Sequence, residues 1–143
     1  MKKHLEVVGG VFVRDGRVLA AKRGESRCQS VAHKYEFVGG KIQANEEREA
    51  ALVREVKEEL HADARVLRHF MTLSHEYTDF SVTLYLYFAE FLTDYENTEH
   101  ESLEWFCADE LIEESWAPAD APAVAALKKL LAGSAPNSAR SEK

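Results

Sequence analysis

The stretch GGKIQANEEREAALVREVKEELHA, residues 39–62, joins a glycine pair to a segment with a strong helical pattern. Residues 46–60 contain neither glycine nor proline and are dominated by Ala, Leu, Glu, Lys and Arg, which are good helix formers. At about 100° per residue, Val53, Val56 and Leu60 are expected on the apolar side of that helix. The charged residues then fall on the other side, where their spacing suggests a function.

Three glutamates, Glu55, Glu58 and Glu59, are spaced i, i+3 and i+4, so their carboxylates converge within one helical turn. One interpretation is a solvated charged face, because neighbouring glutamates are common on surface helices. The other is a divalent-metal site, because converging carboxylates beside a main-chain carbonyl supply the oxygen ligands that Mg²⁺ and Mn²⁺ prefer. The preceding Gly39 and Gly40 favour the metal site, because glycine allows the backbone to approach closely.

The composition predicts one soluble globular domain, since 45% of the 143 residues are hydrophobic and 30% are charged. We expect this domain to cover residues 1–133 and the polar residues 134–143 to form a flexible tail. Lys and Arg number 18 against 25 Asp and Glu, a net charge of −7, which argues against a nucleic-acid polymer as partner. A small phosphorylated substrate stays open, because bound cations reverse the local field.

The two cysteines, Cys28 and Cys107, form no CxxC pair, which predicts reduced thiols in a cytoplasmic protein. The N-terminal sequence MKKHLEVVGG runs straight into a strand pattern and contains no long apolar segment. Neither secretion nor a membrane partner is therefore expected. The sequence leaves a monomer and a homodimer equally open.

The order of apolar patterns predicts strands, a helix, more strands and a final helix. A hairpin is expected at Asp15-Gly16, because Asp-Gly readily adopts the positive φ of a tight turn. The expected strands cover residues 5–14, 17–23, 35–40, 64–74, 81–92 and a run that begins at 101, and the final helix covers 120–133. This order is typical of an α/β or α+β domain in which a mixed β-sheet is sandwiched between α-helices.

The spacing of the charged residues resembles the Nudix box, G-x5-E-x7-R-E-U-x-E-E-x-G-U, in which U is a bulky aliphatic residue. Gly40, Glu46 and the run REVKEEL at residues 54–60 occupy its positions at the correct spacing. His61 stands where the box has its last glycine, which implies a strained or altered turn that costs about 1 kcal/mol. Ala62 replaces the final aliphatic residue.

The similarity extends over most of residues 4–132 and indicates the MutT-like branch of the Nudix hydrolases. It is carried by VVGGVFVRDGRVLAAKR, KYEFVGGK, ESLEWF and WAPADAPAVAAL. Val38 departs from the proline that this branch usually carries before the glycine pair. The resemblance implies the Nudix fold and a Mg²⁺-dependent hydrolysis, with Mn²⁺ as a substitute, of a nucleoside triphosphate to the monophosphate and pyrophosphate. CTP-like and oxidised or otherwise modified deoxynucleotides are the expected substrates.

The resemblance also implies roles for the residues of the box. The expected metal ligands are the Gly39 carbonyl, Glu55, Glu58 and Glu59. Glu46 and Arg54 are the expected brace that ties the loop to the helix. Arg54, Glu55 and Glu58 belong to the expected catalytic group.

A further catalytic carboxylate is expected outside the box. Phosphoanhydride hydrolysis needs neutralised charge, an in-line water and a base that takes or orients its proton. In the MutT-like branch a loop glutamate contributes as ligand or base, and Glu99 in NTEHESLEW holds the matching place, with Glu101 as the second candidate. The alternative for Glu99 is an ordinary surface carboxylate.

Five residues are expected to contact the nucleotide: Arg23, Tyr35, Phe37, Lys41 and Asp120. Arg23 matches an arginine that contacts substrate phosphates, and its alternative is a solvated strand end. Tyr35 and Phe37 are candidate walls of the base pocket, although Phe37 also fits the core. Asp120 matches the base-reading position, where oxidised-guanine members carry asparagine. Its carboxylate suits the exocyclic amine of cytosine or adenine, and its alternative role is to cap the final helix.

Two other functions fit the same resemblance. One is hydrolysis of another nucleoside diphosphate derivative, such as ADP-ribose or a nucleotide sugar. The other is a non-catalytic Nudix module that binds nucleotides, and the intact carboxylates of the box argue against it.

Overall fold

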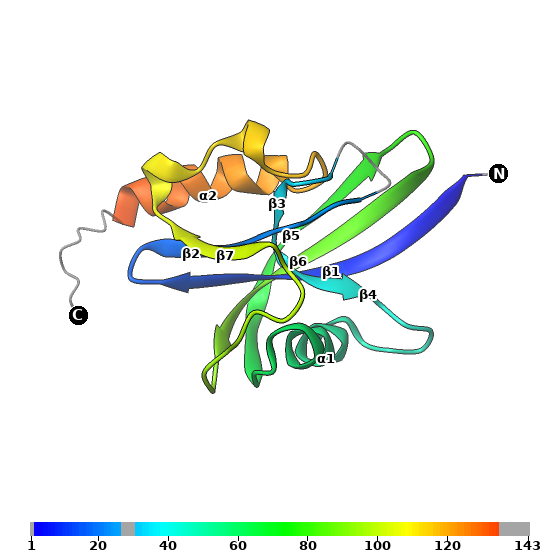
Figure 1. The fold of residues 1–143 in the computed structure, drawn as a ribbon, viewed down its shortest axis with the longest axis horizontal. Coiled ribbons are helices and arrows are strands. Elements are labelled where there is room, and N and C mark those ends of the chain that lie inside the picture. Colours follow the sequence, from blue (N-terminus) through cyan, green and yellow to red (C-terminus); the bar gives the residue numbers. More distant parts are fainter. Residues whose placement is uncertain (1, 27–30, 135–143) are drawn as a thin grey trace. The chain divides into compact units, whose positions relative to one another are not determined.

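The computed structural model describes residues 2–26 and 31–134, so the predictions for Cys28 and for residues 135–143 lie outside the described residues. The strands are β1 (Lys3–Arg14), β2 (Arg17–Lys22), β3 (Tyr35–Glu36), β4 (Val38–Lys41), β5 (Ala64–Glu76), β6 (Phe80–Phe91) and β7 (Ser102–Phe106), and the helices are α1 (Arg48–Leu60) and α2 (Ala121–Ser134) (Figure 1). Short 3-10 turns at Ala108–Glu110 and Glu113–Ser115 precede α2. The α+β class and the order of elements predicted from the sequence are confirmed.

The chain divides into two compact units. The first unit holds the described residues up to Val11 together with Phe37–Glu99. The second unit holds the described residues of Phe12–Glu36 and those from His100 onward. Each unit contains one of the two helices, and β1 passes from the first unit into the second.

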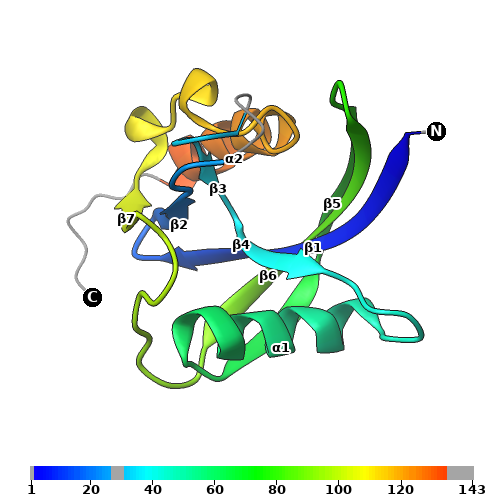
Figure 2. The ribbon, with the colours of Figure 1, turned by 45° about the vertical axis from the view of Figure 1, so that its right-hand side comes forward.

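The first unit is built on two antiparallel pairings. β4 pairs with β1, with Val8 opposite Gly40 and Gly9 opposite Gly39. β5 and β6 form a long antiparallel hairpin, and β6 also lies next to β1. α1 packs against β4 and β5 (Figure 2). This packing attaches the acidic helix directly to the strand that carries the glycine pair.

The second unit is centred on β2. β2 pairs antiparallel with the end of β1, with β3 and with β7. α2 packs against the two 3-10 turns, and Leu19, Leu127 and Leu131 are among the buried core residues. Within the described residues, no helix combines the length and the apolar character that a membrane-spanning segment needs.

The apolar face of α1 differs from the expected one. Val53 is 38% exposed, and Leu52 is fully buried together with Val56 and Leu60. Val56 and Leu60 are thus buried as predicted, and Leu52 takes the place of Val53 in a buried stripe that follows i, i+4 and i+8. The helical period fixes the width of an apolar stripe, whereas packing on the sheet fixes its phase.

The boundaries of two elements also differ from the prediction. α1 begins at Arg48 rather than at Glu46, because a turn precedes it: the Glu46 N–H donates to the Gln43 carbonyl over 3.1 Å, and Asn45 has a φ of 64°. The single strand expected at residues 35–40 is divided into β3 and β4.

Candidate metal and nucleotide site

The two glycines of β4 are packed against different neighbours. A Cβ added at Gly39 would lie 1.9 Å from the carbonyl oxygen of Val8, and a Cβ added at Gly40 would lie 2.3 Å from Glu55 Cδ. Atoms in a close-packed interior do not approach so closely, so a side chain at either position would displace its neighbour. Glycine at position 40 therefore leaves the space that the Glu55 carboxylate occupies.

The Arg54 guanidinium lies at the centre of the charged groups. Its Nε and Nη2 donate to the Glu46 carboxylate over 2.8 and 3.0 Å, and Nη2 also donates to the Lys41 carbonyl over 3.0 Å. Its Nη1 donates to Glu55 Oε2 over 3.1 Å and lies 3.4 Å from both carboxylate oxygens of Glu58. The two-pronged contact with Glu46 is the strong geometry that a planar guanidinium provides. It ties the loop before α1 to the middle of the helix.

These contacts set the protonation states of the pair. The hydrogen bonds from Arg54, followed by that from the Gln43 backbone N–H, hold the pKa of Glu46 below its ordinary value of 4.5. The hydrogen bond to Glu46 in turn raises the pKa of Arg54. Arg54 is therefore a permanent positive charge beside Glu55 and Glu58.

The three carboxylates of α1 differ in their exposure to solvent. The Glu55 side chain is 14% exposed, the Glu58 side chain is 56% exposed, and Glu59 Oε1 is buried. Among residues 2–26 and 31–134, no three acidic, imidazole or thiol groups are placed together as a metal-binding group, and Arg54 is bonded to both Glu55 and Glu58. The donor chemistry fits a hard divalent cation, because carboxylate oxygens lie within one helical turn and a glycine backbone touches one of them.

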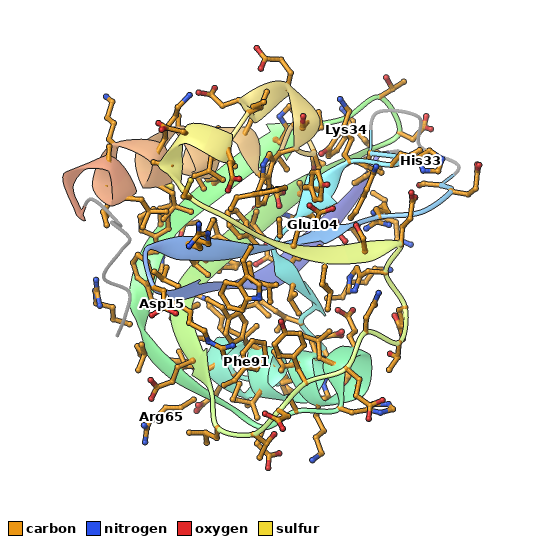
Figure 3. All side chains as sticks on the ribbon, turned by 60° about the vertical axis from the view of Figure 1, so that its left-hand side comes forward. Asp15, His33, Lys34, Arg65, Phe91 and Glu104 are labelled. Carbon is orange, nitrogen blue, oxygen red and sulfur yellow. The ribbon has the colours of Figure 1, made fainter. Side chains whose placement is uncertain are left out.

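The two candidate loop glutamates belong to different units. Glu99 is exposed and ends the first unit. Glu101 belongs to the second unit, where its carboxylate lies 2.9 Å from His33 Nδ1 and 3.9 Å from Lys22 Nζ (His33 is labelled in Figure 3). The contact with His33 lowers the pKa of Glu101, and Glu101 raises the pKa of His33. Glu101 is thus part of a separate charged cluster, and Glu99 stays the first candidate.

Arg23 follows β2, and its Nη2 lies 3.3 Å from Glu36 Oε1 in β3. Burial raises the pKa of Glu36, and Arg23 opposes that rise. Sequence reasoning did not single out Glu36. The pattern that could have pointed to Glu36 is a charged residue between two aromatic residues, Tyr35 and Phe37, in a short strand.

Tyr35 lies on the opposite face of β3 from Glu36, because successive strand residues alternate. Its hydroxyl donates to Glu104 Oε2 over 3.1 Å, and its ring meets the edge of Phe106 at a centroid distance of 5.1 Å (Figure 3 labels Glu104). Burial, followed by this hydrogen bond, raises the pKa of Tyr35. The structure therefore does not bring Tyr35 together with Arg23.

The other three expected nucleotide contacts have separate environments. Phe37 is buried, and its Cβ lies 3.4 Å from a Cβ added at Gly9, which favours a core role. The Lys41 side chain is exposed at the end of β4. Asp120 is 7% exposed, and its carbonyl accepts from the Ala123 N–H at the start of α2. Asp120 therefore occupies the N-cap position.

His61 inside the Nudix box and Val38 just before it depart from the family pattern. His61 ends α1 in the left-handed region, with φ 52° and ψ 37°, and its N–H donates to the Lys57 carbonyl over 3.0 Å. This is the turn that glycine would make, so the position is strained for histidine rather than altered in shape. Val38 is buried in β4.

Comparisons with known proteins cover nearly the whole chain. The NUDIX domain model matches residues 3–127. The chain is 34% identical over 134 residues to the CTP pyrophosphohydrolase of Escherichia coli strain K12, covering 91% of this chain and 96% of that protein. It is 30% identical over 129 residues to the 8-oxo-dGTP diphosphatase of the same strain, covering 90% and 99%. The solution structure of the E. coli ORF135 protein has a TM-score of 0.77 and 31% identity, covering 99% of this chain and 96% of that one.

Proposed function

The chain belongs to the NUDIX domain family, and we propose that it hydrolyses a nucleoside triphosphate to the nucleoside monophosphate and pyrophosphate with a bound divalent metal ion. Two relatives support this substrate class: a CTP pyrophosphohydrolase and an 8-oxo-dGTP diphosphatase, matched over 96% and 99% of their lengths. The observation that carries the proposal is the close contact of Gly40 with the Glu55 carboxylate, beside the Arg54 guanidinium.

The metal ligands that we propose are Glu55, Glu58, Glu59 and the Gly39 carbonyl. Nudix hydrolases generally need a divalent metal ion, and Mg²⁺, with Mn²⁺ as a substitute, fits an all-oxygen ligand set. When bound, the metal neutralises charge on the phosphates and polarises the phosphoryl group under attack. Arg54 and Glu46 keep the carboxylates of α1 in place through the hydrogen bonds described above.

The proton of the attacking water passes to a carboxylate. Glu58 is suited to this role, because it is the most exposed of Glu55, Glu58 and Glu59, and its carboxylate lies 3.4 Å from Arg54 Nη1. Glu99 assists as a ligand or as the base, since it is exposed on the loop after β6.

The nucleotide itself is bound by two further charged residues. Arg23 contacts the phosphates, which compete with Glu36 for its guanidinium. Asp120 reads the base by accepting a hydrogen bond from the exocyclic amine of cytosine or adenine. Asp120 is the buried charged residue among the described side chains, and it directly precedes α2.

A nucleotide panel tests the substrate class. Wild-type protein with Mg²⁺ is expected to release pyrophosphate and a monophosphate from CTP, dCTP or an oxidised deoxynucleotide, as resolved by chromatography. Hydrolysis of ADP-ribose or a nucleotide sugar alone would contradict the triphosphate assignment. If the wild-type protein hydrolyses none of the nucleotides, only the non-catalytic binding module remains as an interpretation.

The same panel, run with Asp120→Asn, tests base recognition. Asparagine caps a helix as well as aspartate, so the fold is retained, whereas its amide donor opposes the amine of cytosine or adenine. We expect kcat/KM for those bases to fall about tenfold relative to guanine substrates, the scale of one mismatched hydrogen bond. Asp109→Asn, an exposed aspartate of the same unit, is the matched control. Unchanged relative kcat/KM across the panel would reduce Asp120 to a helix cap.

A further inference from the structure

Residues 92–99, which follow β6, fold back onto the C-terminal end of α1 (Figure 2). The Glu96 backbone N–H donates to the Leu60 carbonyl over 2.8 Å, and the Thr98 hydroxyl donates to the Glu59 carbonyl over 2.6 Å. The last carbonyls of an α-helix have no partner inside the helix. The loop therefore supplies the hydrogen bonds that finish α1.

The beginning of the same loop is fixed to the turn after α1. The Leu92 N–H donates to the Asp63 carbonyl over 2.8 Å, and the Asp63 N–H donates to Thr93 Oγ1 over 2.9 Å. Asp63 in turn lies 3.0 Å from Lys57 Nζ in the last turn of α1. The loop is thus held at both ends, and its last anchor precedes Glu99 directly.

His61 adds a contact that the glycine of the Nudix box could not make. Its Nδ1 lies 3.5 Å from Glu96 Oε1, in the loop. The strained φ of 52° is the cost of placing an imidazole at this position, on the order of 1 kcal/mol. The departure from the family pattern therefore coincides with a side-chain contact between α1 and the loop.

We propose that Thr98 and His61 are positioning residues that hold Glu99 in place relative to the carboxylates of α1. The hydroxyl of Thr98 joins the residue before Glu99 to the backbone of Glu59, so the two glutamates are linked through a single hydrogen bond. This inference rests on the proposed hydrolytic function for its effect on the rate, and on the hydrogen bonds alone for its effect on the loop.

Substitutions at Thr98 test the positioning role. Thr98→Val keeps the shape and removes the donor, and Thr98→Ser keeps the donor. We expect Thr98→Val to lower kcat about tenfold with KM nearly unchanged, because misplacement of a catalytic group costs rate rather than binding. Thr98→Ser should restore most of kcat. In a Glu99→Gln background, Thr98→Val should cause no further loss, and an equal loss in both backgrounds would overturn the proposal.

Hydrogen exchange gives a readout that does not depend on activity. The Glu96 amide is bonded to the Leu60 carbonyl, so it should exchange faster in Thr98→Val and in His61→Gly than in the wild type. His61→Gly should also raise Tm by relieving the positive φ, which separates loop anchoring from global stability. Unchanged exchange of the Glu96 amide in both variants would overturn the claim that Thr98 and His61 anchor the loop on α1. If the wild type hydrolyses no nucleotide, the proposed function fails, and the exchange experiment still decides the anchor.

Discussion

A single side chain, Arg54, organises the charged groups of the first unit. It makes two hydrogen bonds with Glu46 and contacts Glu55 and Glu58 with the remaining nitrogen. Three carboxylates within one helical turn repel one another, and a fixed guanidinium offsets part of that repulsion. The resemblance to the Nudix box was enough to propose the pair of Arg54 and Glu46. The two-pronged geometry of the contact with Glu46 and the hydrogen bond to the Lys41 carbonyl could be seen only in the structure.

Acid pH should weaken this pair. The folded-state pKa of Glu46 lies below the ordinary value of 4.5, so its stabilising contribution is present above the unfolded-state pKa and is lost as pH falls through the lower folded-state pKa. Urea unfolding from about pH 6 downward should therefore show a smaller loss of unfolding free energy in Glu46→Gln than in the wild type. Glu47→Gln, an exposed neighbour, is the control for removal of a charge. If the unfolding free energies of the wild type and Glu46→Gln fell in parallel as the pH is lowered, this account would be contradicted.

At the level of elements, the two glycines of β4 have different roles, because Gly39 faces β1 and Gly40 faces α1. The space at Gly39 is closed by backbone, the Val8 carbonyl at 1.9 Å from an added Cβ, and backbone cannot move aside cheaply. The space at Gly40 is closed by the far end of the Glu55 side chain, which can rotate away. One position therefore protects the fold, and the other protects the placement of a carboxylate.

Alanine substitutions should separate these two roles. Gly39→Ala should lower the unfolding free energy by about 2 kcal/mol or more, as overpacking against backbone does. Gly40→Ala should leave Tm nearly unchanged and weaken Mn²⁺ binding, because Glu55 is displaced. Gly24→Ala, which meets nothing within 4 Å, is the matched control. Calorimetry and Mn²⁺ titration measure both effects, and a Gly40→Ala variant with wild-type Mn²⁺ affinity would refute the role given to Gly40.

Elements with local signals were predictable, and features set by packing were not. Asp15 and Gly16 have φ values of 54° and 76°, as an Asp-Gly hairpin turn requires, and the register places Val13 opposite Val18. On the buried face of α1, Val56 and Leu60 were predicted correctly, whereas Val53 is exposed and its neighbour Leu52 is buried, because packing on the sheet decides which side of the apolar stripe is covered. The docking of residues 92–99 on α1 also left no local pattern in the sequence.

Across the whole molecule, the expected site residues are distributed over both units. The carboxylates of α1, the glycine pair and Glu99 belong to the first unit, whereas Arg23, Tyr35 and Asp120 belong to the second. The Nudix box predicted the carboxylates of α1 and the neighbouring glycine pair, because these residues lie on one helix and the strand before it. Glu99 lies on the loop after β6 and was expected only from the wider resemblance to the MutT-like branch. Partners such as Glu36 for Arg23 arise from pairing of β2 with β3, which no spacing along the chain encodes.

The most direct test of the central claim is the rate of triphosphate hydrolysis by Glu58→Gln, beside the wild type and Glu49→Gln. Both glutamates are exposed on α1, and only Glu58 belongs to the proposed metal and catalytic group. With Mg²⁺ and a saturating substrate from the panel, Glu58→Gln should lose kcat by about a hundredfold or more at unchanged Tm, whereas Glu49→Gln should keep wild-type kcat. Equal rates for Glu58→Gln and the wild type would contradict the account.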